Sequence, residues 1–419
     1  MKRVLVVDDN ETVLKVLKSE FDRLIDIEAV YAGSYKEAMK KVRENQGNFH
    51  AALLDVDLPD APNGEVISLA NSHNIPAVVL TATINQKIKE TIHKKDILAY
   101  ILKDTPKSIQ HSIKLVQRAL RNYDTTVLVV DDSALYRKVL SDILIKVNIN
   151  VIEAENGQEA LDILKNSTKK ISIVFTDLEM PLMDGLELTI KIREIFDKDQ
   201  LGIIAISAAE DKDINDDFLK FGANDYINKP FTTNEVVTRL NSNLELLDLF
   251  TKITDMANKD FMTGAYNRRY FFESGNAIYL KSERKNMPIA VAMLDIDNFK
   301  TINDTYGHNV GDVAIKEIKS VLDKNLRASD LVARFGGEEF CIILEDISEE
   351  DVKKLFEKIR QVFEDNVIDV DEVEIKYTVS FGIAYGLFGS LDEMVVLSDD
   401  ALYESKESGR NRVTLKHAD

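Results

Sequence analysis

The chain has 419 residues, enough for about two to four domains of ordinary size, and 45% of them are hydrophobic. Its formal net charge of -19 repels phosphate backbones, so the composition disfavours nucleic-acid binding. A lone cysteine, Cys341, excludes an intramolecular disulfide, and no apolar run is long enough to cross a bilayer. We therefore expect a cytoplasmic multidomain protein with no nucleic-acid and no membrane partner.

The first part of the chain contains one sequence pattern twice. Val4–Val7 followed by Asp8-Asp9 returns as Val127–Val130 followed by Asp131-Asp132. In each copy short apolar runs alternate with amphipathic stretches, which is typical of a doubly wound parallel sheet in an α/β domain. The expected strands are Val4–Val7, Ala51–Leu54, Ala77–Leu80, Ala99–Leu102, then Val127–Val130, Ile171–Thr176, Ile203–Ile206 and Asp225–Ile227. We place the two domains at 1–123 and 124–248.

Reactive side chains end the strands at equivalent places in both copies. In each copy an Asp pair follows the first expected strand, and an Asp, a hydroxyl and a lysine come in that order at the ends of the next three expected strands. These residues are Asp8, Asp9, Asp55, Thr81 and Lys103 in one copy, and Asp131, Asp132, Asp177, Ser207 and Lys229 in the other. The carboxyl ends of parallel strands converge, so the three carboxylates fit Mg²⁺, with Mn²⁺ as an alternative, and the other two groups fit phosphoryl oxygens. Simple turn residues explain one Asp pair but not this ordered recurrence.

These motifs resemble the receiver domain of bacterial two-component response regulators, from Met1 to about Leu249. The resemblance implies a flavodoxin-like fold, phosphorylation of Asp55 and Asp177, and Mg²⁺ held by the neighbouring aspartates. It implies Tyr100 and Tyr226 as switch aromatics that act with the hydroxyls and lysines. A histidine kinase or phosphotransfer protein is then the expected partner.

The first copy departs from the receiver pattern in two places. Gly64 lies nine positions after Asp55, whereas Gly185 lies eight positions after Asp177. Lys103 is followed by aspartate rather than by the proline that follows Lys229. Neither departure removes a reactive group, so we expect both sites to be competent.

Apolar residues recur every three or four positions from Val236 to Ile253, which indicates an amphipathic helix. The helix either packs back on the second domain or forms a coiled-coil-like stalk. We favour a stalk over 236–259, overlapping the last helix of the second domain, because the pattern runs past the end of a receiver-sized domain.

In the last region, 260–419, the order and spacing of the apolar runs differ from those of the two repeats. The expected elements are a helix after Asn267-Arg268-Arg269, a strand at Ile289–Leu294, a helix from about Val310, a Gly-Gly hairpin of Leu331–Phe335 and Phe340–Leu344, a strand at Tyr377–Ile383 and a helix through Ala401–Lys406. This pattern predicts an α+β domain with an antiparallel sheet.

Polar residues of this region form a candidate nucleotide site. Asp295 ends a strand, and Glu338 and Glu339 follow the Gly-Gly turn, so they can hold Mg²⁺ together. A solvated hairpin is the simpler reading of the turn alone. Other residues strengthen the prediction of a nucleotide site. Asn303 and Asp312 are suited to guanine, and Lys406 and Arg410 are suited to phosphate. The last two also fit a solvated basic face near a helix end.

Gly336–Phe340 is a GGEEF form of the motif that names the GGDEF family of diguanylate cyclases. The segments Asp260–Arg269, Asp295–His308 and Lys406–Asn411 are also similar to motifs of that family. The resemblance covers the whole last region and implies condensation of two GTP molecules to cyclic di-GMP and pyrophosphate.

The family's site residues carry over to matching positions of this chain. The resemblance implies Mg²⁺ ligation by Asp295, the carbonyl of Ile296 and Glu338, and activation of the 3′-hydroxyl by Glu338 with Glu339. It implies GTP binding through Asn303, Asp312, His308, Lys300, Lys406 and Arg410, with Lys300 also counted as catalytic.

Each such domain binds one GTP, so the active form is expected to be a homodimer that receiver phosphorylation assembles. Arg327 and Asp330 match the family's product-inhibition motif, with Lys358 where relatives have a second arginine. A surface ion pair is the alternative for that motif.

Three other functions remain possible for this sequence. They are a silent GTP or cyclic di-GMP sensor, a regulator that acts only through protein contacts, and a cyclase for another base.

Overall fold

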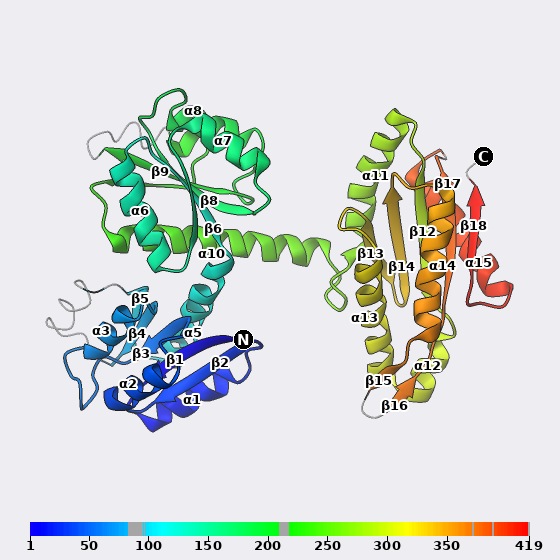
Figure 1. Cartoon of the computed structure of the whole chain (residues 1–419). Coiled ribbons are helices and arrows are strands. Elements are labelled where there is room, and N and C mark those ends of the chain that lie inside the picture. Colours follow the sequence, from blue (N-terminus) through cyan, green and yellow to red (C-terminus); the bar gives the residue numbers. More distant parts are fainter. Residues whose placement is uncertain (83–94, 96, 209–217, 371–372, 388, 418–419) are drawn as a thin grey trace. The chain divides into compact units, whose positions relative to one another are not determined.

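The computed structural model describes residues 1–419 except 83–94, 96, 209–217, 371–372, 388 and 418–419. These residues form two compact units, Met1–Phe250 and Thr251–Asp419. The first unit contains two five-stranded parallel sheets and the second contains a six-stranded sheet (Figure 1). Within the described ranges, no helix has the length and apolar character needed to span a membrane.

The first sheet has the strand order β2-β1-β3-β4-β5, all parallel. Its elements are β1 (Lys2–Val7), α1 (Glu11–Phe21), β2 (Ile27–Ala32), α2 (Tyr35–Glu44), β3 (Ala51–Leu54), α3 (Glu65–Ser72), β4 (Ala77–Thr81), β5 (Ala99–Leu102) and α5 (Pro106–Arg121). Side chains of α1 and α5 pack on one face of the sheet, and those of α2 and α3 pack on the other. The predicted doubly wound sheet is therefore confirmed.

The second sheet repeats this topology as β10-β9-β8-β6-β7. Its elements are β6 (Thr126–Val130), α6 (Ala134–Lys146), β7 (Asn150–Ala154), α7 (Gly157–Asn166), β8 (Ile171–Asp177), α8 (Gly185–Arg193), β9 (Gly202–Ala208), β10 (Asp225–Lys229) and α10 (Thr233–Asn258), after the 3₁₀ turn η1 (Asn122–Asp124). One cluster of buried apolar side chains runs from the first sheet through α5 into α6 and α10. Nη1 of Arg118 on α5 lies 2.9 Å from Oδ2 of Asp248 on α10. The two repeats thus share a core.

Helix α10 changes character along its length. Val236, Val237, Leu240 and Leu244 are buried against the second repeat. Further along the helix, several large apolar side chains are exposed to solvent; they are Leu246, Leu249, Phe250, Ile253 and Met256. The helix therefore packs on its domain at one end and presents an apolar face at the other.

The last unit is built on the sheet β11-β13-β14-β12-β17-β18. Its elements are β11 (Tyr266–Asn267), α11 (Arg268–Lys285), β12 (Ile289–Ile296), α12 (Phe299–Tyr306), α13 (His308–Asn325), β13 (Leu331–Gly336), β14 (Glu339–Glu345), α14 (Glu349–Asp365), β15 (Ile368–Val370), β16 (Val373–Ile375), β17 (Val379–Gly386), α15 (Leu391–Glu407) and β18 (Val413–His417). The four central strands are antiparallel, as predicted, while β11 and β18 pair in parallel at the edges, so the whole sheet is mixed.

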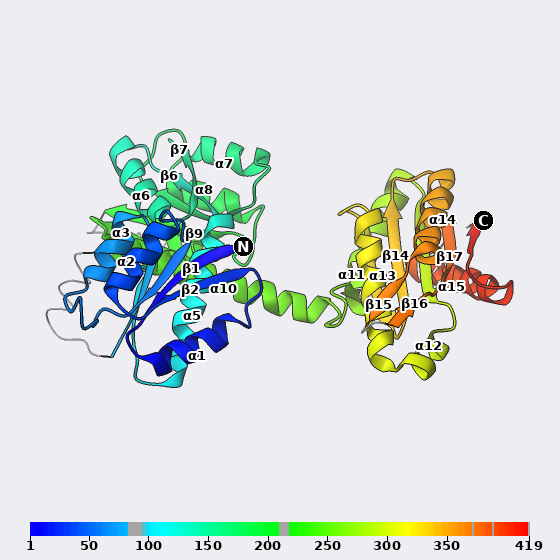
Figure 2. The same cartoon turned by 60° about the horizontal axis from the view of Figure 1, so that its bottom comes forward.

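Helices cover both faces of this sheet. Helices α13 and α14 lie on one face, and α11 and α15 lie on the other (Figure 1). Apolar side chains of each pair of helices join the buried cluster on their own face. Helix α12 and the small β15–β16 pair lie at the same end of the unit in both views (Figures 1 and 2). The candidate site is formed where β12 ends and β13 turns into β14.

Candidate active site

The strand register brings the acidic residues of the last unit to one end of its sheet. Strand β12 pairs with β14 up to Leu294, which lies opposite Phe340. Asp295 and Glu339 are the next residues beyond that pair, and Glu338 lies in the tight turn between β13 and β14. Gly337 in this turn has φ +50, a left-handed conformation that glycine adopts without steric cost.

Asp295 is the buried centre of this cluster, with only 5% of its surface exposed. Burial raises the pKa of its carboxyl to about 6; Lys406, whose Nζ lies 2.8 Å from Oδ2, opposes this rise, and Glu338 and Glu339 add to it. Carboxylates that repel one another around a partly dry site are a donor set for a hard divalent cation. The residues present therefore fit Mg²⁺.

Asn303 and Asp312 lie on two neighbouring helices that approach each other closely at Gly311. Asn303 lies on α12, and Asp312 follows Gly311 on α13. A Cβ at Gly311 would lie 2.0 Å from Oδ1 of Asn303, so only glycine fits there. That oxygen is buried and has no hydrogen-bond donor in the described part of the chain. Buried acceptors are rarely left unpaired in folded proteins, so this one is suited to an N–H of a ligand.

The predicted phosphate-binding residues are more dispersed. Lys406, on α15, is in contact with Asp295. Lys300 on α12, His308 at the start of α13 and Arg410 after α15 have exposed side chains. The structure thus joins Lys406 to the acidic cluster and leaves the other three at the surface.

Sequence reasoning missed Arg334, which holds the turn in place. Its Nε and Nη2 donate to the carbonyl oxygen of Gly337 at 2.9 and 2.7 Å, and its Nη1 lies 2.9 Å from Oδ1 of Asp260. Burial alone would raise the pKa of Asp260, but hydrogen bonds from Arg334 and Thr263 outweigh it and hold that pKa below its ordinary value. The opening segment of the domain is thereby tied to the Gly-Gly turn.

The first receiver brings Asp8, Asp9 and Asp55 together, with one carboxylate oxygen from each within 4.8 Å of the others. Nζ of Lys103 lies 2.6 Å from Asp8 and also contacts Asp55. Burial lowers the pKa of Lys103, but its bonds to the two carboxylates outweigh burial and leave the pKa raised. Thr81 at the end of β4 is buried, and half of the surface of the Tyr100 side chain is exposed.

The second receiver forms the same constellation from Asp131, Asp132 and Asp177. Nζ of Lys229 lies 2.9 Å from both Asp131 and Asp177, and the Lys229–Pro230 peptide bond is cis. Burial raises the pKa of Asp177, Lys229 opposes it and Asp131 adds to it. Among the predicted switch residues of this receiver, Ser207 is buried and Tyr226 is half-buried.

The loops after Asp55 and Asp177 differ, as their glycine spacing predicts. A Cβ at Gly185 would lie 2.0 Å from the carbonyl oxygen of Asp177, so that loop requires close backbone approach. Gly64 instead has φ +71 and begins α3 in a left-handed conformation.

Arg327 and Asp330 lie together in a loop before β13. The Arg327 N–H donates to Oδ2 of Asp330 at 2.8 Å, and burial raises the pKa of Asp330 against the opposing effect of Arg327. Both line a cavity of about 390 Å³ that Lys259 and Tyr266 also line. Lys358 is exposed on α14 and does not line it.

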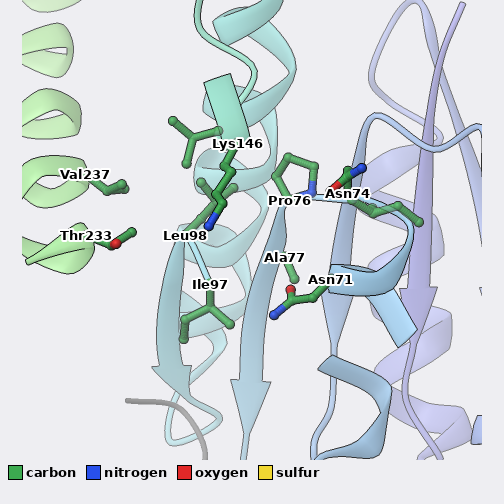
Figure 3. Close-up of a pocket in the computed structure, with 11 residues that line it drawn as sticks. Asn71, Asn74, Pro76, Ala77, Ile97, Leu98, Lys146, Thr233 and Val237 are labelled. Atoms are coloured by element: carbon green, nitrogen blue, oxygen red, sulfur yellow. The ribbon is translucent and has the colours of Figure 1, made fainter. Parts of the chain in front are cut away.

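A separate cavity lies where the two receivers meet (Figure 3). It is lined by Asn71, Asn74, Ile75, Pro76, Ala77, Ile97 and Leu98 of the first receiver, by Lys146 and Val147 at the end of α6, and by Thr233 and Val237 of α10. None of the predicted site residues lines it.

Comparison with known families gives a match for each domain. The family described as the response regulator receiver domain matches residues 4–114 and 127–241, which is more than half of the chain. The family described as "Diguanylate cyclase, GGDEF domain" matches residues 257–412.

Individual relatives have the same combination of domains or part of it. The response regulator PleD of Caulobacter vibrioides is 28% identical over 286 residues, which is 64% of this chain and 63% of PleD. Diguanylate cyclase A of Treponema denticola is 38% identical over 171 residues, 39% of this chain and 46% of that protein. This chain therefore spans less than two thirds of either relative. A crystal structure of a two-component response regulator/GGDEF domain protein matches with 34% identity and a TM-score of 0.50, over 59% of this chain and 100% of that one.

Proposed function

This chain belongs to the response regulators, with two receiver domains followed by a GGDEF domain, and we propose that it condenses two GTP molecules to cyclic di-GMP with release of two pyrophosphates. The observation that carries the proposal is Oδ1 of Asn303, which lies beside Gly311 and Asp312, is buried, and has no hydrogen-bond donor among the residues that the structure describes. Guanine offers an N2–H₂ donor group that adenine lacks, and a carboxylate can accept from such a donor edge. These acceptors favour guanine over adenine.

The side chains around Asp295 support the chemistry of the transfer. Asp295, the carbonyl of Ile296 and Glu338 would hold Mg²⁺, which neutralises triphosphate charge when bound. Glu338, with Glu339 beside it, takes the proton of the 3′-hydroxyl. The freed oxygen forms a bond to the α-phosphorus of the second GTP, and the bond from that phosphorus to its pyrophosphate breaks. The same step in the opposite direction, with the 3′-hydroxyl of the second GTP attacking the first, closes the ring, so two pyrophosphates leave. Lys406, Arg410 and Lys300 offset the negative charge on the phosphates.

Cyclic di-GMP is two-fold symmetric, so the proposed reaction needs two GTP-loaded domains facing each other. We infer that the active species is a homodimer and that phosphorylation of Asp55 or Asp177 by a histidine kinase or phosphotransfer protein promotes it. The exposed apolar face of α10 supports this inference, because an apolar helix face is suited to a second copy of itself. GTP as substrate and a kinase as partner support a cytoplasmic location.

Arg327 and Asp330 support a further part of the proposal, which is inhibition by the product. An arginine can clamp phosphate or stack on guanine, and an aspartate can accept guanine N–H groups. Lys358 offers only a point charge, so its contribution to inhibition is expected to be weak.

Purified protein treated with beryllofluoride, Mg²⁺ and GTP provides the direct test, with chromatography for cyclic di-GMP. We expect product from GTP and none from ATP. Glu338→Ala should abolish turnover, and Asn303→Ala should raise KM for GTP about tenfold, the equivalent of one hydrogen bond of about 1.4 kcal/mol. GTP left unconverted by the activated wild type, at protein concentrations where it is dimeric, contradicts the proposal.

A further inference from the structure

Asp297 is a buried carboxylate that has no role in the proposed mechanism. It follows β12 directly, lies two residues after Asp295, and has 4% of its surface exposed. Oδ1 accepts a hydrogen bond from the Ser380 hydroxyl at 2.6 Å, and Oδ2 accepts one from the Thr378 hydroxyl at 2.6 Å. Oδ2 also accepts the backbone N–H of Asn411 at 2.9 Å, from a segment 114 residues away. One carboxylate thus joins the end of β12, the start of β17 and the loop after α15.

The loop that Asp297 holds has an unfavourable backbone. Gly409, Arg410 and Asn411 have φ of +114, +64 and +47, so three successive residues lie in the left-handed region. Residues other than glycine persist there only when their surroundings fix them. Contacts with the rest of the domain must therefore hold the loop in this conformation. Without those contacts the position of Arg410 would not be fixed.

Asn411 supplies those anchors from both sides. Its N–H reaches Asp297, its Oδ1 accepts from Nη1 of Arg360 at 2.7 Å, and its Nδ2 donates to Oε1 of Glu364 at 3.0 Å. Arg360 and Glu364 lie on α14 and form an ion pair of 2.7 Å. Of these anchors, only the bond to Asp297 connects the loop to the strand that carries Asp295.

We propose that Asp297 is a positioning residue that fixes the loop bearing Arg410 relative to Asp295, so that phosphate and metal are held at one spacing. The inference rests on the proposed function, since it assigns Arg410 to the triphosphate. Asp297 itself touches no substrate. Its role is to keep a cation donor preorganised, and preorganised contacts bind more tightly than contacts that must first be ordered.

The test measures binding of α,β-methylene GTP with Mg²⁺ by calorimetry. Asp297→Ala should weaken binding about tenfold, because Arg410 loses its fixed place. Asp297→Asn should stay within about twofold of wild type, because its amide oxygen can accept from the Asn411 N–H while its NH₂ donates to the Ser380 hydroxyl. Ser380→Ala, which removes a bond to the same carboxylate but not the loop anchor, should also stay near wild type. Wild-type affinity in Asp297→Ala overturns the proposal.

A double-mutant cycle separates positioning from general damage. In an Arg410→Ala background, Asp297→Ala should cost almost nothing further, because the residue through which it acts is gone. Additive losses overturn the proposal. If thermal melting shows that Asp297→Ala does not fold, Asp297→Ser keeps a polar group at this position but is too short to reach the Asn411 N–H, and it must show the same non-additivity with Arg410→Ala. Turnover of the wild type is measured separately. If the wild type binds the GTP analogue but forms no cyclic di-GMP, the proposed function is contradicted and this inference is not.

Discussion

The carboxyl of Asp295 would give the proposed Mg²⁺ binding a pH dependence. Burial raises its pKa to about 6, against Lys406 and with Glu338 and Glu339. A raised pKa keeps the proton on until the pH rises through that value, and a protonated carboxyl is a poor ligand for Mg²⁺. We expect the Mg²⁺ concentration for half-maximal turnover to increase steeply below about pH 6 and to level off above about pH 7.

Mg²⁺ titrations of turnover between about pH 5 and about pH 8 check this expectation. Asp295→Asn should need more Mg²⁺ at every pH and should lose the step near the pKa. A step that survives in Asp295→Asn assigns the titration to another group.

Sequence reasoning identified residues whose chemistry is local and overlooked those whose partners are distant. Asp295 was found because it ends an apolar strand, and Asn303 and Asp312 because their groups suit guanine. Asp297 was given no role, because its partners at Thr378, Ser380 and Asn411 become neighbours only when β17 and the last loop fold beside β12.

Arg334 links two elements, the opening turn of the last domain and the β13–β14 turn. Its guanidinium reaches Asp260 with one nitrogen and the Gly337 carbonyl with two others. Lysine keeps the charge but lacks this fork. We expect both Arg334→Ala and Arg334→Lys to lower kcat about tenfold or more, because Glu338 loses its fixed place, as happens when catalytic groups are misplaced.

Steady-state kinetics with GTP, together with thermal melting, measure that effect. Lys281→Ala is the matched control, because Lys281 forms an exposed ion pair of 2.7 Å with Glu345 in the same domain and should leave kcat unchanged. Wild-type kcat in Arg334→Lys shows that charge alone suffices and contradicts the role of the fork.

Among the elements, uninterrupted apolar runs were predicted most accurately, and elements with a mixed polar and apolar pattern were often missed. Ala51–Leu54 and Ala99–Leu102 were predicted with the observed bounds. No range was predicted for β2 or β7, whose residues are mostly half-buried or exposed and carry a mixed pattern. Helix α14 was also missed, although Val352, Phe356, Ile359 and Phe363 recur at helical spacing and are buried. The helical spacing of these apolar residues was visible in the sequence. The short β15–β16 pair that follows has no comparably clear pattern.

In the whole molecule, α10 connects the shared core of the two receivers to the proposed dimer contact. Its first turns are buried with both repeats in one apolar cluster, and Asp248 pairs with Arg118 of the first receiver. Both receivers therefore contact the same helix. The exposed residues that follow at three- and four-residue spacing are suited to pairing with a second copy.

Ile253 tests whether that face assembles the active species. It is 61% exposed, and burying an isoleucine side chain contributes roughly 1.5–3 kcal/mol. We expect Ile253→Asp to weaken beryllofluoride-induced dimerisation at least about tenfold in sedimentation velocity and to lower turnover in parallel. Lys252→Asp, on the adjacent exposed position of the helix, should leave both unchanged. Because dimerisation and turnover are measured on the same samples, a dimer that forms normally in Ile253→Asp removes α10 from the interface. A monomer with full turnover removes the need for a dimer at all.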